Sequence, residues 1–359
     1  MVCGSFPPLR CGVGEYAYHL AQALLRAGIE ELEVLTSSVP GDASTDEGNI
    51  QVHRVIPNWS SWQLLSTLRF IVGRRPDVVH IQYPSSKYNG PLASLLPFFL
   101  RLRGIRVVQT WHEHFNECRS VAWPNLLGCD ALIHVRPDLP DKLPNWVKRG
   151  LTAKPVVFIR NASTIPVNAL DVSESQMLRQ QISEQAPIVA FFGFANINKG
   201  VDRLFQIADP ERHHLLLICD LDPADSYQKG LLDQIAQPPW KGKVTVTGFQ
   251  SAEAVAGFLA VSDAVLFPFP GGAGEWNTSL QAAEAAGAFS LATTQDRRLC
   301  GFDATRNLYL ADCDDLEGMR NALATHLGRR IDPDRSDVWR SIAQSHIQVY
   351  QSVVRAAGS

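Results

Sequence analysis

Short runs of aliphatic and β-branched residues alternate with helix-length segments along nearly the whole chain. Apolar runs of this kind predict parallel strands that helices cover on both faces. The predicted strands are residues 31–36, 50–55, 77–82, 106–111, 131–135 and 155–159 in the first half, and 187–194, 214–219, 243–249, 264–269, 289–294 and 308–312 in the second. Helix-length segments separate most of them, beginning with residues 13–27. The pattern predicts an α/β fold with doubly wound sheets.

Residues 161–186 interrupt this alternation, because they are polar and contain only one short helix-length segment. We interpret them as a linker between two doubly wound, Rossmann-like domains, over residues 1–165 and 166–335. A length of 359 residues also favours two domains over one. The last segment, residues 336–359, contains one more long predicted helix at 338–356 that neither sheet needs.

The composition excludes several classes of protein. With 45% hydrophobic residues, 19% charged residues and a formal net charge of −3, the chain has enough apolar material for full cores and lacks the basic character of nucleic-acid-binding proteins. Its seven cysteines are scattered, odd in number and without a CxxC pair. They indicate reduced thiols in a cytoplasmic protein rather than disulfides or a zinc site. The start of the chain shows no basic region typical of a secretory signal.

The most apolar stretch is PLASLLPFFLRL, residues 91–102. It is shorter than the roughly 18 residues that a membrane-spanning helix requires. We therefore predict a buried helix. A helix that lies on a membrane surface is the alternative, although such helices usually carry more basic residues along one face.

Loops at the carboxyl ends of the strands are where open α/β sheets bind ligands. The first strand, in MVCGS, is short and leads into a loop in which Gly12 and Gly14 open a helix. Glycines permit close approach to the backbone, and a helix start offers amides to an anion. A tight strand-to-helix turn explains the glycines equally well, and GxGxxG is incomplete because position 17 is Ala17.

Two other loops carry ionisable side chains. Lys199, in NINKG, lies at a predicted helix start, where a cation is unfavourable unless an anion sits beside it. A solvated surface lysine is the alternative. His112 and His114 follow the strand at 106–111 and suit either a ligand contact or a structural role. A metal site is the third option, but no further ligand has a recognisable spacing.

The segment GGAGEWNTSLQAAEAAG, residues 271–287, joins glycines to a helix start. Thr278 and Gln281 have capping-box spacing, which places the start of the helix near Thr278. The amides of Thr278, Ser279 and Leu280 are then expected to face an anion such as a phosphate.

Acidic residues in the second half have several interpretations. Glu275 precedes the helix and suits a ligand hydroxyl or the helix dipole. Glu284 lies about two turns into the helix, where a buried carboxylate needs a partner; a surface glutamate is the alternative. The strings DLD (220–222) and DCD (312–314) resemble cation-binding pairs, but chance explains them better.

Together these loops resemble those of the retaining, nucleotide-sugar-dependent glycosyltransferases of family 4, which have the GT-B fold. The similar stretches are FPPLRCGVGEY, DVVHIQYPS, VVQTWHEHF, FFGFANINKGVDRLFQIA and VSDAVLFPFPGGAGEWNTSLQAAEAAG, in this order and over nearly the whole chain. The resemblance implies two Rossmann-like domains that face a central cleft. The first would be the acceptor-side domain and the second would bind the donor, while the final helix would cross back to the first.

The resemblance also implies a role for each matching residue. It assigns donor binding to Gly12, Gly14, Lys199, Gly248, Phe249, Thr278, Ser279, Leu280 and Glu284. Within that set, Lys199 and the helix amides would bind the diphosphate, and Glu284 would hold the ribose hydroxyls. Backbone around Gly248 would meet the base. His112, Glu275 and Lys199 would form the catalytic group, with His112 and Glu275 near the transferred sugar.

Three departures from the family pattern stand out. The first of the family's two glutamates would fall at Trp276, so that Glu275 is offset by one residue. Phe194 replaces the arginine that usually follows the first donor-domain strand. The first strand is shorter than in relatives, which is compatible with a start upstream of Met1.

The resemblance implies a retaining transfer of a sugar from a UDP- or GDP-linked donor to a glycan, lipid-linked or small-molecule acceptor, as in polysaccharide biosynthesis. The donor would be a co-substrate, and no metal or other cofactor would be required. A GT-B-type nucleotide-sugar epimerase and a non-catalytic nucleotide-sugar-binding relative are the alternatives. We expect a cytoplasmic protein with no nucleic-acid partner, in which residues 94–104 are the segment for any peripheral contact with the inner face of the membrane.

Overall fold

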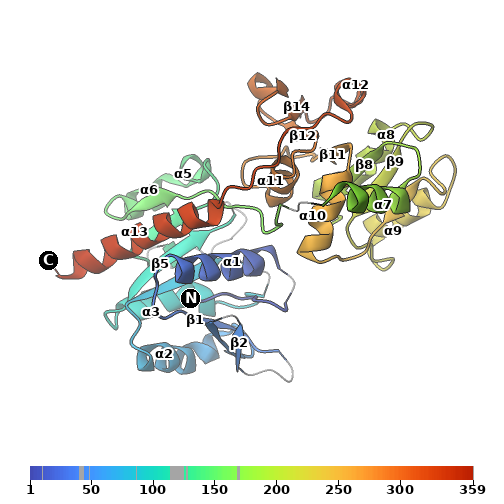
Figure 1. Ribbon diagram of the computed structural model, residues 1–359. Coiled ribbons are helices and arrows are strands. Elements are labelled where there is room, and N and C mark those ends of the chain that lie inside the picture. Colours follow the sequence, from blue (N-terminus) through green and yellow to red (C-terminus); the bar gives the residue numbers. More distant parts are fainter. Residues whose placement is uncertain are drawn as a thin grey trace. The chain divides into compact units, whose positions relative to one another are not determined.

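The computed structural model describes residues 1–9, 11–39, 44–47, 49–85, 87–113, 125–126, 128–167 and 170–358. The chain forms two compact units (Figure 1). Unit 1 comprises Met1–Ala162 and Asp337–Ser359, and unit 2 comprises Ser163–Ser336. The divisions therefore fall after residues 162 and 336, where the sequence pattern placed them after 165 and 335.

Unit 1 contains two sheets that the first residues of the chain connect. One has the order β1 (Glu33–Ser37), β3 (Ile50–Ile56) and β2 (Ser44–Glu47), and the other has the order β4 (Val78–Tyr83), β5 (Arg106–Trp111), β6 (Ala131–His134) and β7 (Val156–Phe158). Val2 forms parallel bridges to Leu35 of β1 and Ile81 of β4. The short first strand that the sequence predicts in MVCGS is thus limited to the two bridges of Val2. Strand β2 was not predicted, and it pairs antiparallel with β3.

Helices cover both faces of the unit 1 sheets. They are α1 (Gly12–Arg26), α2 (Leu64–Gly73), α3 (Leu92–Arg101), α5 (Leu139–Lys142), α6 (Asn145–Leu151) and α13 (Val338–Gly358), with a 3-10 turn η1 at Ser61–Gln63. The final helix α13 packs on α1 through one apolar cluster that includes Leu20, Leu24, Ile342 and Val353. The expectation of a buried helix at 91–102 is confirmed, because α3 buries most of its apolar side chains, although Phe98 is half exposed.

Unit 2 is built on a seven-stranded sheet with the order β10 (Val244–Val246), β9 (His214–Ile218), β8 (Ile188–Phe192), β11 (Ala264–Phe267), β12 (Ser290–Thr294), β14 (Leu308–Asp312) and β13 (Gly301–Asp303). The pairs are parallel except that of β13 with β14, and β13 was not predicted. From β8 the chain builds outward through β9 and β10, and then crosses to β11 on the other side. The order therefore reverses between β8 and β11, the place where doubly wound sheets bind ligands.

The helical segments of unit 2 are α7 (Val172–Ile182), η3 (Ile197–Lys199), η4 (Val201–Arg203), α8 (Leu204–Ile207), α9 (Ser226–Ile235), α10 (Ala252–Val261), α11 (Thr278–Ala285), η5 (Arg297–Leu299) and α12 (Leu316–His326). Helix α7 is the short helix expected in the segment 161–186, and Asp171 and Glu174 form its capping box. Across the described residues, no helix is both long and apolar enough to cross a membrane.

Candidate active site

The loop after β8 lies against the first turn of α11. Gly193 has φ +144°, and a Cβ at this position would lie 3.3 Å from the Oγ of Ser279. Residues other than glycine rarely adopt such a backbone conformation. The glycine therefore lets the exit of β8 approach the start of α11 closely, at the point where the strand order reverses.

Lys199 does not lie at the start of an α-helix, so that expectation is wrong. It ends the 3-10 turn η3, and Gly200 follows with φ +59°. A Cβ on Gly200 would lie 2.4 Å from the carbonyl oxygen of Pro268, so the turn packs tightly on the loop after β11. The Nζ of Lys199 lies 4.2 Å from the centre of the Phe269 ring, which is a cation–π contact. The lysine is thus held by the two loops that meet at the reversal point.

Helix α11 begins at Thr278 as expected, but the capping box is absent. Asn277 is the N-cap residue, and its side chain does not bond to the first-turn amides. The Oδ1 of Asn277 instead accepts from the amide of Gly274 at 2.7 Å, and the side chain of Gln281 donates to the carbonyl of Glu275. The first helical amides therefore receive no cap from Asn277, and an anion is a suitable partner for them.

Glu284 is mostly buried and forms an ion pair with an arginine. Its side chain is 18% exposed, and its Oε1 lies 2.8 Å from a guanidinium nitrogen of Arg306. Burial raises the pKa of Glu284, whereas Arg306 opposes this shift and the charges of Asp303 and Glu275 add to it. Arg306 comes from the turn between β13 and β14, where Asp303 accepts from the amide and hydroxyl of Thr305. The interpretation of Glu284 as a surface residue is therefore wrong.

The offset at Glu275 has a structural explanation. The indole of Trp276 folds back over Gly274, because a Cβ on Gly274 would lie 2.2 Å from that ring. Glu275 is exposed, and only its carbonyl is engaged with Gln281. Of the two neighbours, Glu275 therefore presents a carboxylate to solvent in front of α11, while Trp276 packs on the loop.

The loop after β10 places Gly248 and Phe249 at one edge of the sheet. Gly248 has φ +70°, and its carbonyl accepts from the hydroxyl of Thr247 at 2.8 Å. The side chain of Gln250 donates to the carbonyl of Thr247 at 2.6 Å. Phe249 and Phe194 are both more than half exposed, at 54% and 63%. These aromatic side chains are available to stack on a planar ligand.

The two glycines of unit 1 differ in what surrounds them. Gly14 is buried, and a Cβ there would lie 2.8 Å from the carbonyl oxygen of Ser5. Gly12 is exposed, with nothing within 4 Å of an added Cβ. Packing of α1 on the exit of the first strand therefore explains Gly14, while Gly12 is the glycine that leaves room for a ligand.

His112 heads a chain of buried hydrogen bonds. Its Nε2 lies 2.9 Å from the Oε1 of Gln82, and the amide nitrogen of Gln82 lies 3.3 Å from the Nε2 of His80. The Nδ1 of His80 lies 2.7 Å from the hydroxyl of Tyr350 on α13. The ring of His112 also packs edge-on against Tyr16 of α1. The final helix is thereby connected to the candidate site residue.

Burial lowers the pKa of His112 to about 3, and His346 acts in the same direction. The imidazole is therefore neutral at neutral pH. Since the amide oxygen of Gln82 can only accept, Nε2 carries the proton and Nδ1 is the basic nitrogen. This arrangement suits a hydrogen bond to a ligand hydroxyl better than proton abstraction.

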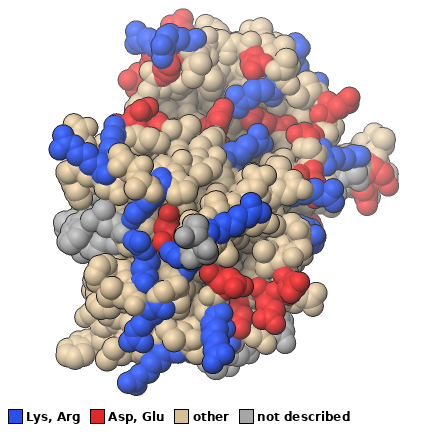
Figure 2. Space-filling view, turned by 90° about the vertical axis from the view of Figure 1, so that its left-hand side faces the viewer, with Lys and Arg blue, Asp and Glu red and all other residues tan. Residues whose placement is uncertain are grey.

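Within the described part of the chain, no three His, Cys, Asp or Glu side chains gather as a metal site would require. Asp312 and Asp314 of the DCD string pair with Arg297 and Arg203 respectively. His114 and Cys118 lie outside the described residues, and the other cysteines form no disulfide with one another. On the face drawn in Figure 2, Lys and Arg lie among Asp and Glu, and neither sign covers that face.

Sequence reasoning missed three residues of this arrangement: Gln82, Tyr350 and Arg306. For Gln82 the sequence did carry a signal, because His80 and Gln82 are polar residues that alternate with Val79 and Ile81 in a predicted strand. Such residues require buried partners. No sequence pattern indicated Tyr350 or Arg306. The contact of Tyr350 depends on the packing of α13, and that of Arg306 depends on the hairpin of β13 and β14.

Solved structures with the same fold cover both units. Sucrose-phosphate synthase from Thermosynechococcus elongatus is 17% identical with a TM-score of 0.72, over 99% of each chain. The catalytic domain of starch synthase IV from Arabidopsis thaliana, bound to ADP and acarbose, is 14% identical with a TM-score of 0.67. HepE from Anabaena, in complex with UDP and glucose, is 14% identical with a TM-score of 0.64. The last two alignments cover 99% of this chain and 98% of the other. At these identities the likeness establishes the GT-B fold.

Residues 11–158 match the family model of the glycosyl transferase 4-like domain. Residues 11–158 therefore form a glycosyl transferase 4-like domain, and the protein is a glycosyltransferase. No curated protein matches its sequence significantly. The family match lies within unit 1 of this glycosyltransferase, and the GT-B fold extends over both units. The expected GT4-like family and fold are confirmed, whereas the roles of the individual site residues stay predictions.

Proposed function

We propose that this glycosyltransferase transfers a sugar from a nucleoside diphosphate sugar with retention at the anomeric carbon. The observation that supports this most strongly is the uncapped first turn of α11, which meets Gly193 at the reversal point of the unit 2 sheet. Helix starts at such points bind phosphate groups well. Complexes of fold relatives with UDP and with ADP make a nucleoside diphosphate the natural first ligand to test.

Each donor group has a proposed partner in unit 2. The diphosphate binds the amides of Thr278, Ser279 and Leu280 and the ammonium of Lys199. The ribose hydroxyls bind the carboxylate of Glu284, and the base lies near Gly248 and Phe249. Lys199 and the helix amides stabilise the charge that develops on the leaving diphosphate, so the proposed reaction requires no metal.

The proposed chemical step is a front-face substitution. The bond from the anomeric carbon to the diphosphate oxygen breaks, the acceptor oxygen bonds to the same face of that carbon, and the acceptor proton passes to the departing diphosphate. His112, as a neutral imidazole, orients a sugar hydroxyl, while the backbone at Gly12 and Gly14 approaches the sugar or phosphate. Glu275 faces the sugar, and a covalent intermediate on its carboxylate is the alternative mechanism.

A screen of UDP-, GDP- and ADP-linked sugars by thermal shift tests the donor, and NMR of the product tests the configuration of the anomeric carbon. We expect Lys199→Ala to lower kcat/KM by about 100-fold or more, since it removes a charge that stabilises the leaving group. Lys229→Ala is the matched control, because Lys229 is exposed on α9 and pairs with Asp233. An unchanged kcat/KM and donor affinity in Lys199→Ala would refute the diphosphate site, and an inverted product would refute retention.

The acceptor is proposed to be a glycan or a lipid-linked sugar, with peripheral contact between α3 and a membrane. Phe98 and Leu102 are 51% and 65% exposed beside Arg101 and Arg103. Apolar side chains beside basic ones favour binding to anionic lipid surfaces. Co-sedimentation with vesicles that contain an anionic phospholipid at low salt tests this, with Phe98→Ser as the variant expected to lose binding. Equal co-sedimentation of both proteins would rule out α3 as the contact.

A further inference from the structure

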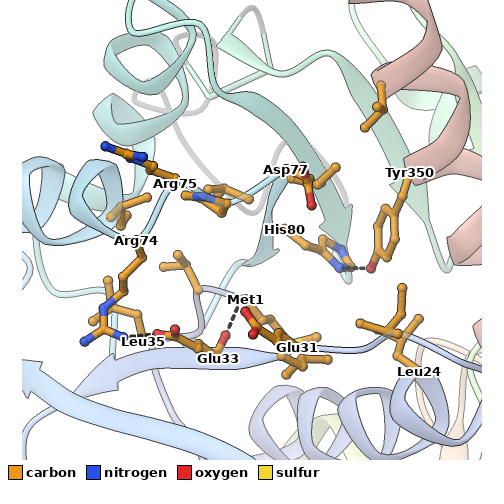
Figure 3. A pocket seen from close by; sticks show the side chains of 18 of the residues that line it. Met1, Leu24, Glu31, Glu33, Leu35, Arg74, Arg75, Asp77, His80 and Tyr350 are labelled. Carbon is orange, nitrogen blue, oxygen red and sulfur yellow. Dashed lines mark hydrogen bonds and ion pairs between the residues drawn. The ribbon is translucent and has the colours of Figure 1, made fainter.

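Four side chains of unit 1 form the hydrogen-bonded chain that runs from the final helix to the candidate site residue His112. His80 and Gln82 belong to β4, His112 directly follows β5, and Tyr350 belongs to α13. In Figure 3 the side chains of His80 and Tyr350 point toward each other, and a dashed line marks their hydrogen bond. The final helix thus contributes a hydroxyl group to the inner strands of the sheet.

The direction of each hydrogen bond in this chain follows from the groups that have only one role. The amide oxygen of Gln82 accepts from Nε2 of His112, and its amide nitrogen therefore donates to Nε2 of His80. Burial lowers the pKa of His80 well below its usual value, so this ring is neutral. A neutral imidazole that accepts at Nε2 carries its proton on Nδ1, which donates to the hydroxyl oxygen of Tyr350 at 2.7 Å. Each donor in the chain therefore points away from His112 and toward Tyr350.

The two hydroxyl groups that contact His80 have different consequences for its tautomer. The hydroxyl of Thr110 lies 2.7 Å from Nε2, and a hydroxyl can donate or accept. Thr110 is therefore compatible with a proton on Nε2 and with its absence. Tyr350 is the partner of Nδ1, and a buried proton at that atom needs an acceptor. The tautomer of His80 therefore depends on Tyr350.

Helix α13 also holds the ring of His112 by a second route. Nδ1 of His346 donates to the carbonyl of Ile342 at 2.8 Å, which leaves Nε2 to accept from the hydroxyl of Tyr16 at 3.5 Å. The ring of Tyr16 packs edge-on against that of His112, with the ring centres 4.8 Å apart. The hydrogen-bonded chain from Tyr350 therefore acts on a ring whose orientation is fixed by packing.

We propose that Tyr350 and Gln82 are positioning residues that fix the proton of His112 on Nε2 and keep its Nδ1 as the acceptor for a sugar hydroxyl. The proposal rests on the role of His112 in the proposed function. Without the hydroxyl of Tyr350, the proton of His80 moves to Nε2, where Thr110 accepts it. The amide of Gln82 then turns over, because its nitrogen cannot face a protonated nitrogen, and it donates to Nε2 of His112. His112 now carries its proton on Nδ1, so the acceptor has become a donor.

Nitrogen NMR of the full chain with isotope-labelled histidines, without donor and at neutral pH, tests the tautomer. Protonated and unprotonated imidazole nitrogens have well-separated chemical shifts, and His112→Gln identifies the signals of His112. We expect Nδ1 of His112 to be unprotonated in the parent and protonated in Tyr350→Phe. Tyr18→Phe is the matched control, because it removes a hydroxyl from a different apolar cluster of unit 1 and should keep the parent pattern.

Release of nucleoside diphosphate tests the consequence for the reaction, with the nucleotide sugar that the thermal-shift screen selects from the UDP-, GDP- and ADP-linked set. We expect Tyr350→Phe to lower kcat by about tenfold and to leave KM for the donor within about twofold, because His112 orients a hydroxyl and does not bind the diphosphate. Gln82→Met interrupts the chain between the two histidines and should lower kcat at least as much. Adding Tyr350→Phe to Gln82→Met should lower kcat no further, because Tyr350 acts through Gln82.

Three outcomes would overturn the proposal. An unchanged tautomer of His112 in Tyr350→Phe would refute the chain and leave the proposed function untouched. A changed tautomer with an unchanged kcat would show that His112 does not orient the sugar, which refutes its role in the proposed function and the positioning with it. Losses of kcat that multiply in the double variant would show that Tyr350 does not act through Gln82.

Discussion

In unit 1, side chains on the inner strands form a buried chain of polar contacts from His112 through Gln82 and His80 to Tyr350. In unit 2, the inner strands β8 and β11 carry only apolar side chains, and charged groups such as Lys199 and Glu284 lie beyond the strand ends. The two units share a doubly wound architecture. The strands named here nevertheless differ in where their polar groups lie.

The difference follows from the electrostatics of burial. Burial lowers the pKa of His80, His112 and His346 in unit 1, so these rings are neutral. Hydrogen bonds to Gln82, Tyr350 and Tyr16 hold them in place. Unit 2 keeps a cation and an uncapped helix start at its surface, where an anion can be bound. One unit is therefore suited to orient neutral hydroxyl groups, and the other to bind a charged leaving group.

The largest effect is expected from acid, and mainly in unit 1. The pKa of His112 is about 3 and that of His346 about 4 in the folded protein, against 6.5 for the unfolded chain. The unfolded chain therefore binds more protons in this range. The contribution of these two histidines to stability is complete above about pH 6.5 and decreases by several kcal/mol as the pH falls toward 4.

Limited proteolysis in graded urea, with cleavages assigned by mass spectrometry, measures this loss in each unit. His346→Gln keeps a polar side chain but cannot titrate, so the pH dependence of unit 1 should become shallower. The comparison between the units fails if unit 2 is destabilised by acid as much as unit 1, or if the variant retains the full slope.

The second prediction, with an effect of intermediate size, distinguishes two reasons for glycine at the start of α1. Gly14 is explained by close packing, and Gly12 by room for a ligand. Gly14→Ala places a methyl group 2.8 Å from the carbonyl oxygen of Ser5, so the backbone must shift, and we expect a loss of about 2 kcal/mol. Gly12→Ala meets open space and should change stability by less than about 0.5 kcal/mol. Urea denaturation of the two variants measures both values. Equal losses would mean that contact with Ser5 does not explain Gly14.

The elements that the sequence predicted well are those whose cause is local. Strands β5 and β14 lie in short segments rich in aliphatic and aromatic residues, and their observed bounds equal the predicted ones. The edge strands β2 and β13, STDE and GFD, were missed because an edge strand needs no apolar run. Pairing with one neighbour is sufficient for them.

The candidate site shows the same limit. Spacing correctly placed the start of α11 at Thr278, but it could not distinguish a capping box from the observed bond between Gln281 and the carbonyl of Glu275. The burial of Glu284 and its ion pair with Arg306 depend on the hairpin of β13 and β14, which follows α11 and β12 in the chain. Long-range packing, rather than local pattern, determines the charge state of this carboxylate.

The prediction with the smallest expected effect concerns the charge of the Glu284 carboxylate. In Arg306→Ala, burial and the charges of Asp303 and Glu275 still raise the pKa of Glu284, but the arginine no longer opposes them. Glu284 then takes up a proton at a higher pH than in the parent protein and becomes a weaker acceptor for the proposed ribose hydroxyls. We expect the affinity for UDP to fall by less than tenfold at pH 6 and to be nearly unchanged at pH 8, as measured by calorimetry.

Arg298→Ala is the control for Arg306→Ala, because Arg298 is exposed and pairs with Asp296 near the end of another strand. A constant ratio of affinities between Arg306→Ala and the parent from pH 6 to 8 would show that Arg306 does not control the charge of Glu284. A ratio that changes with pH in the opposite sense would show that the arginine itself competes with the nucleotide for the carboxylate. The first result would make the ion pair of unit 2 a fixed structural contact, like the hydrogen bonds of the buried histidines in unit 1. The second result would make the ion pair a barrier to donor binding.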